Sequence, residues 1–410
     1  MTMGTHDALA GKARLVVAQM GAPTAVMNAS LWGFLEGAGS CDVLGVFGGP
    51  AGLLRGDLRP LRGSSPHHGA AHGSSAPVVD PGIVGDPGAW LGAGRHPFAE
   101  ADLDTVVGAL GAMGVDGVAL IGGNGTMFLA NELHRRALQR DLALSVVGVP
   151  KTVDNDLAGT DHAPGFPSAA RFLAQAVRAL ALDLRAMTSI EEVRVVETLG
   201  RNSGWLALAT LLARSAAGGA PHLVYVPERP FNKESFLRDI RNAVDRHGAA
   251  LVVVAEGTAG LGDSSPFDHA VFDRPVSGGV ASAMARLVEE HLGFGTRAEV
   301  PGLIQRCASW AVSAVDRSEA QVLGAEGARL LRRGVSGVMV ALPERHPGEP
   351  PAATPTTVPL AEVAGRTRPV PSHWVPTPEG NAFEFVDWLR PLVGGLEKSG
   401  AGEVRRAGAG

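Results

Sequence analysis

Residues 144–157 read LSVVGVPKTVDNDL, a run of apolar residues that passes directly into a lysine, a threonine and two aspartates. The first half has the length and β-branched content of a strand that is buried on both faces. The second half brings Lys151, Asp154 and Asp156 together immediately after that strand. Asp and Asn side chains favour turns, so a purely structural role is one interpretation. The other is that two carboxylates beside a lysine hold a metal ion and accept a proton during group transfer.

The same pattern, a short aliphatic run followed by a glycine turn and a helical segment, repeats along the chain. Such runs occupy residues 14–20, 117–123, 144–150, 192–200, 222–228 and 250–257. Segments with helical periodicity include residues 101–113, 168–187 and 233–248. Strands that alternate with helices are typical of parallel βαβ units. We therefore expect an α/β fold built from doubly wound sheets.

The bulk composition is that of a globular protein. A chain of 410 residues is too long for one ordinary core, which predicts two domains or one large unit. The net charge of −5 predicts no nucleic-acid partner. The chain has two cysteines, no signal-peptide pattern at its start and no apolar stretch near the roughly 20 residues that span a bilayer. We therefore expect a cytoplasmic protein with no membrane partner.

Three regions depart from the repeating pattern. Residues 56–94 are rich in Gly and Pro and are expected to form a long surface loop, whose three closely spaced histidines lack the carboxylate or cysteine support of a metal site. Residues 344–380 are rich in proline and are expected to run over the surface before a short helix within residues 381–393. Residues 396–410 are expected to form a disordered tail.

The turns that follow the strands are the places to search for a ligand site, because open α/β sheets bind ligands at the carboxyl ends of their strands. Three of these turns are candidates for phosphate binding, namely GAPTAVMNAS from Gly21, GNGTM from Gly123 and the turn of Lys151. The sequence contains no GxxxxGK[ST] motif and no GxGxxG after its first strand. This excludes a P-loop and argues against a nicotinamide-dependent oxidoreductase. Each turn alone is equally compatible with a structural role, but three in series favour a phosphate ligand.

The order of these motifs resembles that of the phosphofructokinases, in both the ATP-dependent and the pyrophosphate-dependent branch. The matching motifs are GAPTAVMNAS (21–30), GGNGT (122–126), PKTVDNDL (150–157), ETLGRNSGWLA (197–207), VPERPF (226–231) and RAEVPGLIQR (297–306). The resemblance extends from about residue 14 to residue 395 and marks a divergent member of the family. It implies two doubly wound Rossmann-like domains with the active site between them.

The resemblance also implies a domain order and an activity. We expect an N-terminal phosphoryl-donor domain in residues 1–165, a sugar-phosphate domain in residues 166–305 and a C-terminal segment, residues 306–395, that completes both. The implied reaction moves a phosphoryl group from ATP or pyrophosphate to the primary hydroxyl of a sugar phosphate, such as fructose 6-phosphate or a related ketose phosphate. The implied cofactor is Mg²⁺, and the implied assembly is a homodimer or homotetramer.

Individual roles follow from the same resemblance. Asp154 would be the base, Thr152 would contact the transferring phosphoryl group and Arg95 would stabilise it, while Asp156 and Asn124 would hold Mg²⁺. The implied donor-binding residues are Gly21 (through its backbone N–H), Gly123, Asn124, Gly125, Thr126 and Lys151. The implied sugar-binding residues are Leu199, Gly200, Arg201, Glu228, Arg306 and, from a neighbouring subunit, Arg297.

Several positions depart from the family's pattern. Asn124 stands where most members carry an aspartate near the metal. Gly125 leaves room for the α-phosphate of ATP, whereas Lys151 is typical of pyrophosphate users; we favour ATP because space for the nucleotide is the harder requirement. Leu303 replaces a His or Tyr, and Glu192 replaces an arginine, that contact the acceptor's phosphate.

Because both of the last two departures fall at the acceptor's phosphate, we expect intact transfer chemistry on a sugar other than fructose 6-phosphate, unless Arg194 replaces the missing arginine. An ordinary phosphofructokinase that tolerates Leu303 and Glu192 is one alternative. A non-catalytic regulatory subunit that binds a sugar phosphate on the same fold is another. The retention of both Asp154 and Asp156 argues against that subunit, because a binding module needs no base there. The donor, the acceptor, the effectors and the number of subunits stay open.

Overall fold

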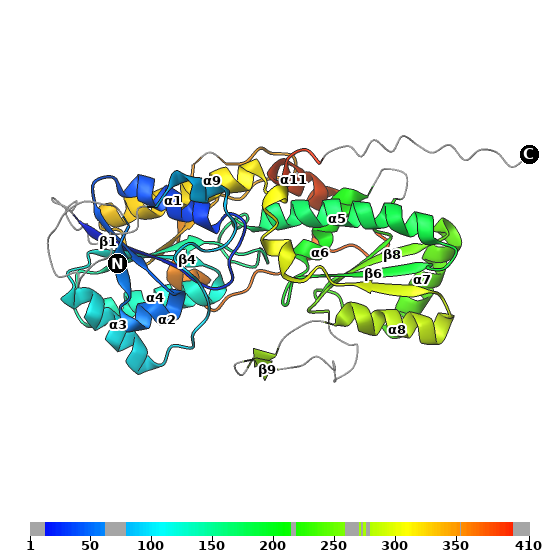
Figure 1. Cartoon of the computed structure of the whole chain (residues 1–410), viewed down its shortest axis with the longest axis horizontal. Coiled ribbons are helices and arrows are strands. Elements are labelled where there is room, and N and C mark those ends of the chain that lie inside the picture. The colour runs from blue at the N-terminus through cyan, green and yellow to red at the C-terminus, as the bar shows by residue number, and fades with distance from the viewer. Residues whose placement is uncertain are drawn as a thin grey trace, which may run out of the picture.

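A computed structural model of the chain describes residues 13–61, 79–214, 219–258, 270–271, 274–275, 279–352 and 354–396. Two α/β units lie next to one another along the long axis of the molecule (Figure 1). The histidines of the expected long loop and the expected tail from residue 397 onward lie outside the described residues. Within the described residues, no helix is both long enough and apolar enough to cross a bilayer.

The first unit is built on a seven-stranded sheet with the order β13-β12-β5-β4-β1-β2-β3. Its strands are β1 (Arg14–Gln19), β2 (Asp42–Val46), β3 (Leu58–Pro60), β4 (Gly117–Gly122), β5 (Ser145–Pro150), β12 (Val338–Ala341) and β13 (Thr356–Pro359). The pairs β2–β3 and β12–β13 are antiparallel and the others are parallel. Every residue of the central strand β4 is buried, as expected for a strand covered on both faces.

Helices cover both faces of this sheet, with α1 and α9 on one side and α2, α3 and α4 on the other (Figure 1). The helices of this unit are α1 (Met27–Ala38), α2 (Gly49–Arg55), α3 (Glu100–Ala112), α4 (Asn124–Gln139), α9 (Ala314–Arg332) and α10 (Leu360–Val363). Successive residues of β1 point to opposite faces of the sheet and pack into the two hydrophobic cores that flank it. Val16 packs with α3 and α4, whereas Leu15 packs with α1 and α9. Helices α1 and α9 approach so closely that a Cβ at Gly33 would collide with the carbonyl of Gln321.

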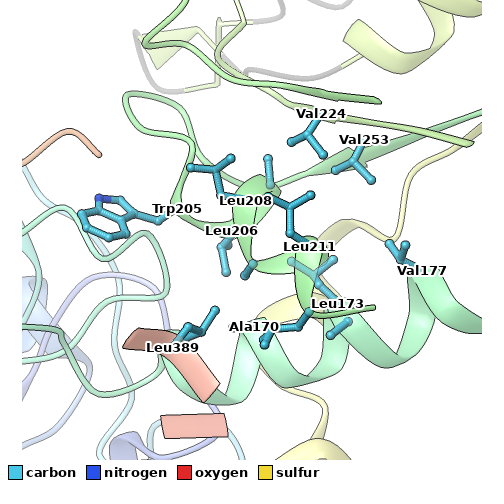
Figure 2. Packing of buried hydrophobic residues seen from close by; sticks show 14 of the residues in the cluster. Ala170, Leu173, Val177, Trp205, Leu206, Leu208, Leu211, Val224, Val253 and Leu389 are labelled. Carbon is cyan, nitrogen blue, oxygen red and sulfur yellow. The ribbon is translucent and has the colours of Figure 1, made fainter. Parts of the chain in front are cut away.

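The second unit has a parallel four-stranded sheet with the order β11-β6-β8-β7. Its elements are β6 (Val193–Thr198), β7 (Leu223–Tyr225), β8 (Ala250–Ala255), β11 (Thr296–Glu299), α5 (Phe166–Met187), α6 (Trp205–Ala209), α7 (Lys233–His247), α8 (Val280–Leu292) and α11 (Phe383–Val393). Figure 2 shows its core, in which Leu173 of α5 and Leu208 of α6 gather beneath Val224 and Val253 of the sheet. A separate antiparallel ribbon joins β9 (Ala270–Val271) to β10 (Arg274–Pro275).

The doubly wound α/β class expected from the sequence is therefore confirmed, and each of the six aliphatic runs forms a strand. Two regions expected as irregular surface chain contain edge strands instead, β3 within residues 56–94 and β13 within residues 344–380. Both strands contain proline, which an edge position tolerates because one side of an edge strand needs no N–H donors. Residues after 306 contribute to both units, with α9, β12 and β13 in the first and α11 in the second.

Candidate active site

A cavity of about 1040 Å³ lies between the two units. Its wall contains the turns that follow β1, β4 and β5 of the first sheet and β6, β8 and β11 of the second. Carboxyl ends of parallel strands are the usual ligand-binding edge of such sheets. The predicted site residues in the wall are Gly21, Arg95, Gly123, Asn124, Gly125, Thr126, Lys151, Thr152, Asp154, Asp156, Leu199, Arg201 and Arg306. The turns expected from sequence to bind phosphate thus converge on one space.

The turn after β5 brings both candidate carboxylates to this space. Its central residue, Asn155, adopts a left-handed conformation with φ of 53°, which asparagine tolerates better than most residues. The Asn155 side chain accepts a hydrogen bond from the N–H of Ala163 at 3.0 Å, and Thr152 Oγ1 accepts one from the N–H of Asp154 at 3.1 Å. These local bonds fix a tight turn, and its residues Asp154 and Asp156 both line the cavity.

Asp154 lies among four cationic side chains. Burial raises the pKa of its carboxyl group above the usual range, and Lys151, Arg95, Arg201 and Arg306 oppose that rise without cancelling it. A carboxylate whose pKa is raised toward neutral is better matched to proton transfer than an ordinary exposed aspartate. The surrounding cations would also favour a negatively charged ligand in the same space.

Lys151 connects two of the turns. Its Nζ donates a hydrogen bond to the carbonyl of Ala22 at 2.5 Å, so the turn after β5 is joined to the turn after β1. Burial lowers the pKa of this amine to about 7, with Arg306 and Arg95 adding to the effect and Asp154 opposing it. The charge of Lys151 therefore depends on what else occupies the cavity.

The segment that carries Arg95 is held against the first turn by backbone bonds. Gly21 N–H donates to Gly94 O at 2.7 Å and Gly94 N–H donates to Gly21 O at 3.0 Å. The N–H that the resemblance assigned to the phosphoryl group is thus engaged by Gly94, because the two glycines pair as an antiparallel bridge. Two buried amides extend this support, since Gln19 accepts from Leu91 N–H and Asn28 accepts from Trp90 N–H.

Oxygen atoms of Asn124 and Asp156, beside the turn that follows β5, fit a hard divalent cation. Asn124 Oδ1 is buried and lacks a hydrogen-bond partner among the described residues, while its Nδ2 donates to Asp156 O at 3.3 Å. Burial and the Asp154 charge raise the pKa of Asp156 to about 6. A cation bound nearby would therefore stabilise the ionised form of this carboxylate. Among the residues that the structure describes, no group of three His, Cys, Asp or Glu side chains could hold a metal. Mg²⁺ does not need such a group, because it is commonly bound by one or two carboxylates with waters and substrate phosphate.

The start of α4 forms the side of the cavity where the resemblance places the donor. Gly123, Asn124 and Gly125 stand at its N-terminus, where backbone N–H groups and the helix dipole favour an anion. A Cβ built on Gly125 would meet none of the described atoms within 4 Å, so this part of the cavity is open. Apolar side chains of the cavity wall also come from α3, α4 and the chain before α3, namely Phe98, Leu103, Phe128 and Leu129.

The resemblance places the acceptor at the end of the cavity that contains Leu303. Leu303 lines the cavity with 59% of its surface exposed. The Glu192 carboxylate accepts from Gly295 N–H at 2.7 Å. Arg194 is buried and is paired with Glu191 at 2.6 Å and with Asp183 at 2.6 Å, so it does not replace the arginine missing at position 192. That option, which the sequence left open, is wrong because the guanidinium is committed to two carboxylates inside the second unit.

Three predicted sugar-binding residues lie outside the cavity wall. Glu228 accepts from the N–H groups of Gly204 and Val370, which commits its carboxylate to the backbone. Gly200 lies in the turn after β6 between two lining residues and has φ of 130°, where a side chain would be strained. Arg297, whose side chain is 60% exposed, donates to Glu191 at 3.3 Å.

Glu256 is a cavity residue that the sequence reasoning missed. Burial and the charge of Asp154 raise its pKa to about 7, and Arg201 opposes the rise. Glu256 directly follows β8, in the aliphatic run of residues 250–257, so the rule that ligands bind at strand ends could have found it. In the structure Glu256, rather than Glu228, is the glutamate that faces the predicted sugar side.

Comparison with known proteins agrees with this geometry. The family model described as phosphofructokinase matches residues 14–331. A sulfofructose kinase of Alkalicoccus urumqiensis is 36% identical over 381 residues, which cover 93% of this chain and 95% of that protein. A pyrophosphate–fructose 6-phosphate 1-phosphotransferase of Xanthomonas campestris pv. campestris is 33% identical and covers 88% of this chain and 86% of its own length. The crystal structure of a pyrophosphate-dependent phosphofructokinase from Marinobacter aquaeolei matches with a TM-score of 0.79 at 27% identity, over 94% of this chain and 92% of that one.

Fold, site and relatives together define a phosphotransferase. The chain belongs to the phosphofructokinase family, and the relatives named above are phosphotransferases whose acceptors are sulfofructose and fructose 6-phosphate. The family resemblance seen in the sequence motifs is thereby confirmed.

Proposed function

We propose that this protein transfers a phosphoryl group from ATP to the primary hydroxyl of an anionic ketose, with Asp154 as the general base. The observation that carries this proposal is the position of Asp154 in the cavity among Lys151, Arg95, Arg201 and Arg306. Asp154 accepts the hydroxyl proton as the oxygen attacks phosphorus and the bond to the leaving phosphate breaks. The cations stabilise the negative charge that is spread over the transferring group.

Asp156 and Asn124 are the residues that would hold Mg²⁺. The orphaned Oδ1 of Asn124 and the carboxylate of Asp156 supply hard oxygen ligands, and donor phosphates and water complete such a site. The ion would neutralise charge on the donor phosphates. Thr152 and the first N–H groups of α4 orient the same phosphates from the protein side.

We propose ATP, rather than pyrophosphate, as the preferred donor. The open space over Gly125 and the apolar side chains Phe98, Leu103 and Phe128 in the cavity wall give room and contact area for a nucleoside beyond the phosphates. Pyrophosphate has no group that would use this surface. Lys151 is the feature that points to pyrophosphate, although its bond to Ala22 also gives it a role in joining two turns.

We propose that the acceptor carries a sulfonate where fructose 6-phosphate carries a phosphate. Leu303 can neither donate a hydrogen bond nor carry charge. Glu192 is a carboxylate, and the guanidinium of Arg194 is paired with Asp183 and Glu191, so neither residue supplies a cation to the cavity. A phosphate monoester carries between one and two negative charges at neutral pH, whereas a sulfonate carries one. Fewer cations therefore suit the sulfonate, and the similarity to a sulfofructose kinase supports the same choice. Glu256 and Arg201 would contact the sugar itself.

The acceptor end also favours a second copy of the chain. Val300, Ile304 and Trp310 are exposed apolar residues close to Leu303 in the sequence, and Arg297 is exposed on the preceding strand β11. We propose a cytoplasmic homodimer. In this dimer, Arg297 of each copy contacts the acceptor bound to the other copy. When Asp154→Asn and Arg297→Ala subunits are mixed in equal amounts, about half of the dimers should contain one subunit of each kind. Each mixed dimer has one intact site out of two, so the mixture should regain up to about a quarter of wild-type activity. Absence of regained activity in a proven mixed dimer would refute the shared site.

An acceptor and donor panel tests the proposed function. Initial rates are measured with sulfofructose, fructose 6-phosphate and fructose, each with ATP or pyrophosphate and Mg²⁺. We expect the highest kcat/KM for sulfofructose with ATP, and a loss of roughly 10²- to 10⁴-fold in kcat for Asp154→Asn. Calorimetry should show that this variant still binds the acceptor. Ordinary efficiency with fructose 6-phosphate would refute the altered acceptor, and an active Asp154→Asn variant would refute the base.

A further inference from the structure

Residues 366–370, which we term the crossing segment, run from the first unit to the second beside the cavity. The segment follows α10, and its Thr367 forms an antiparallel bridge with Leu157 and lines the cavity. Its last residue, Val370, is buried in the core of the second unit. The segment therefore has one end on the catalytic turn and the other in the opposite unit.

Arg368 binds the backbone of the catalytic turn at several points. Its N–H donates to Asp156 O at 2.8 Å. Its guanidinium donates to Thr160 O and Asp161 O, both at 2.7 Å, and to Asn155 O at 3.2 Å. Carbonyl groups that accept from a guanidinium form stronger bonds than neutral pairs do. One side chain thus fixes the backbone from Asn155 to Asp161.

The same segment is attached to the second unit by three further contacts. The Arg368 guanidinium lies 4.6 Å from the centre of the Trp205 ring, and Trp205 Nε1 donates to Arg368 O at 3.2 Å. Val370 N–H donates to Glu228 at 2.9 Å. Both carboxylate oxygens of Glu228 accept from Gly204 N–H at 3.0 Å. Glu228 therefore joins the crossing segment to the start of α6.

These contacts close a ring between two turns that face the cavity. Gly204 and Ser203 directly follow Arg201 and Asn202, which line the cavity. Ser203 Oγ donates to Asp154 O at 3.2 Å. The turn of Asp154 and the turn of Arg201 are therefore bonded directly at Ser203 and indirectly through Glu228 and the crossing segment.

We propose that Arg368 and Glu228 are positioning residues, which hold the turn of Asp154 in register with the turn of Arg201. The inference rests on the proposed function, because it assigns the two turns to one reaction. Base and sugar-side cation come from different sheets, and an error of about 1 Å between them can cost roughly 100-fold in rate. This role accounts for a glutamate that the sequence marks as functional yet that lies outside the cavity wall.

Kinetics of Glu228→Gln, Arg368→Lys and the double variant test the proposal. Gln keeps the shape of Glu with a single acceptor oxygen, and Lys keeps the charge of Arg without its fork. We expect each single change to lower kcat by about 10- to 100-fold with little change in acceptor KM, and the double variant to lose no more than the worse single. Multiplying effects would overturn the proposal. A rise in acceptor KM alone for Glu228→Gln would instead make Glu228 a direct sugar contact.

Hydrogen exchange gives a readout that needs no turnover, so it separates failure of this inference from failure of the proposed function. Glu228→Gln, a change in the second unit, should speed amide exchange in residues 155–161 of the first. Arg214→Lys is the matched control, because Arg214 is a partly buried arginine that donates to Pro221 O and His222 O away from the cavity. It should leave kcat and exchange in residues 155–161 unchanged. Exchange that rises only around residues 204 and 228 would overturn the coupling.

Discussion

Replacing Leu303 by tyrosine should return part of the preference for a phosphate-bearing acceptor. Leu303 lies in the cavity wall on the short 3-10 helix Gly302–Arg306, beside the cationic Arg306. Since 59% of the leucine surface is exposed, the larger side chain needs no space inside a core. The change adds one hydroxyl donor and no charge, so it tests hydrogen bonding alone.

The expected size follows from this exposure. A hydrogen bond to a charged group contributes about 1.5–3 kcal/mol, and the lower end applies because solvent reaches this site. A gain of about 1.5 kcal/mol corresponds to roughly tenfold in kcat/KM for fructose 6-phosphate relative to sulfofructose. Leu303→His should act in the same direction and more strongly at pH 6 than at pH 8, because imidazole carries charge only at the lower pH.

Paired initial-rate measurements on both acceptors provide the assay. Leu182→Tyr is the matched control, because Leu182 is 43% exposed on α5 of the same unit and is outside the cavity wall. It should leave the ratio of the two kcat/KM values unchanged. If Leu303→Tyr raised both values equally, or neither, Leu303 would not face the acid group of the acceptor and the reasoning from the lost donor would fail.

Three further predictions concern the donor, the metal and the fold. Gly125→Asp puts a carboxylate into the open space where the α-phosphate of ATP is expected. Repulsion of about 3 kcal/mol between the two charges at about 5 Å should lower kcat/KM for ATP roughly 100-fold in initial-rate assays, and should lower kcat/KM for pyrophosphate far less. Asn124→Asp adds a charged ligand and should lower the Mg²⁺ concentration for half-maximal rate several-fold; an unchanged titration would exclude position 124 from the metal site. Burial opposes the charge on His162, but Glu319 and Asp161 outweigh it and raise its pKa from 6.5 to about 9. The charged His162 thus contributes about 3 kcal/mol to the free energy of unfolding below pH 6.5, and this contribution is lost as pH rises through 9. Thermal melts from pH 7 to 10 should show the loss of stability, and His162→Gln should abolish this pH dependence.

The sequence predicted the central strands and the position of the turn of Asp154 for one physical reason. A strand covered on both faces is mostly apolar, so β4, β5 and β8 stand out as continuous runs, and the turn after such a run falls at the ligand edge. The two edge strands of the first sheet carry no such signal. β3 and β13 have three and four residues, contain proline and face solvent, so their pairing depends on neighbours rather than on their own pattern.

The site residues divide in a similar way. Position along a strand end identifies Asp154 and could have identified Glu256, but it does not distinguish a carboxylate that faces a cavity from one bound to the backbone. Glu228 also lies near a strand end, after β7, and only the spatial approach of Gly204 and Val370 shows that its oxygens are occupied. The same holds for Gly21, whose N–H is engaged by a residue more than seventy positions away.

The arrangement of the two sheets explains why positioning residues lie outside the cavity. Each sheet would supply only half of the proposed chemistry, because Asp154, Asp156 and Lys151 follow strands of the first and Arg201, Glu256 and Arg306 follow strands of the second. A sheet is rigid, so the relative placement of these groups depends on the segments that join the two units. Residues 366–370 bond to the backbone of the first turn directly and to that of the second through Glu228, and Thr367 is the residue of this segment that lines the cavity. Substitutions in this segment should therefore alter kcat while leaving the choice of acceptor unchanged, whereas substitutions at Leu303 should do the reverse.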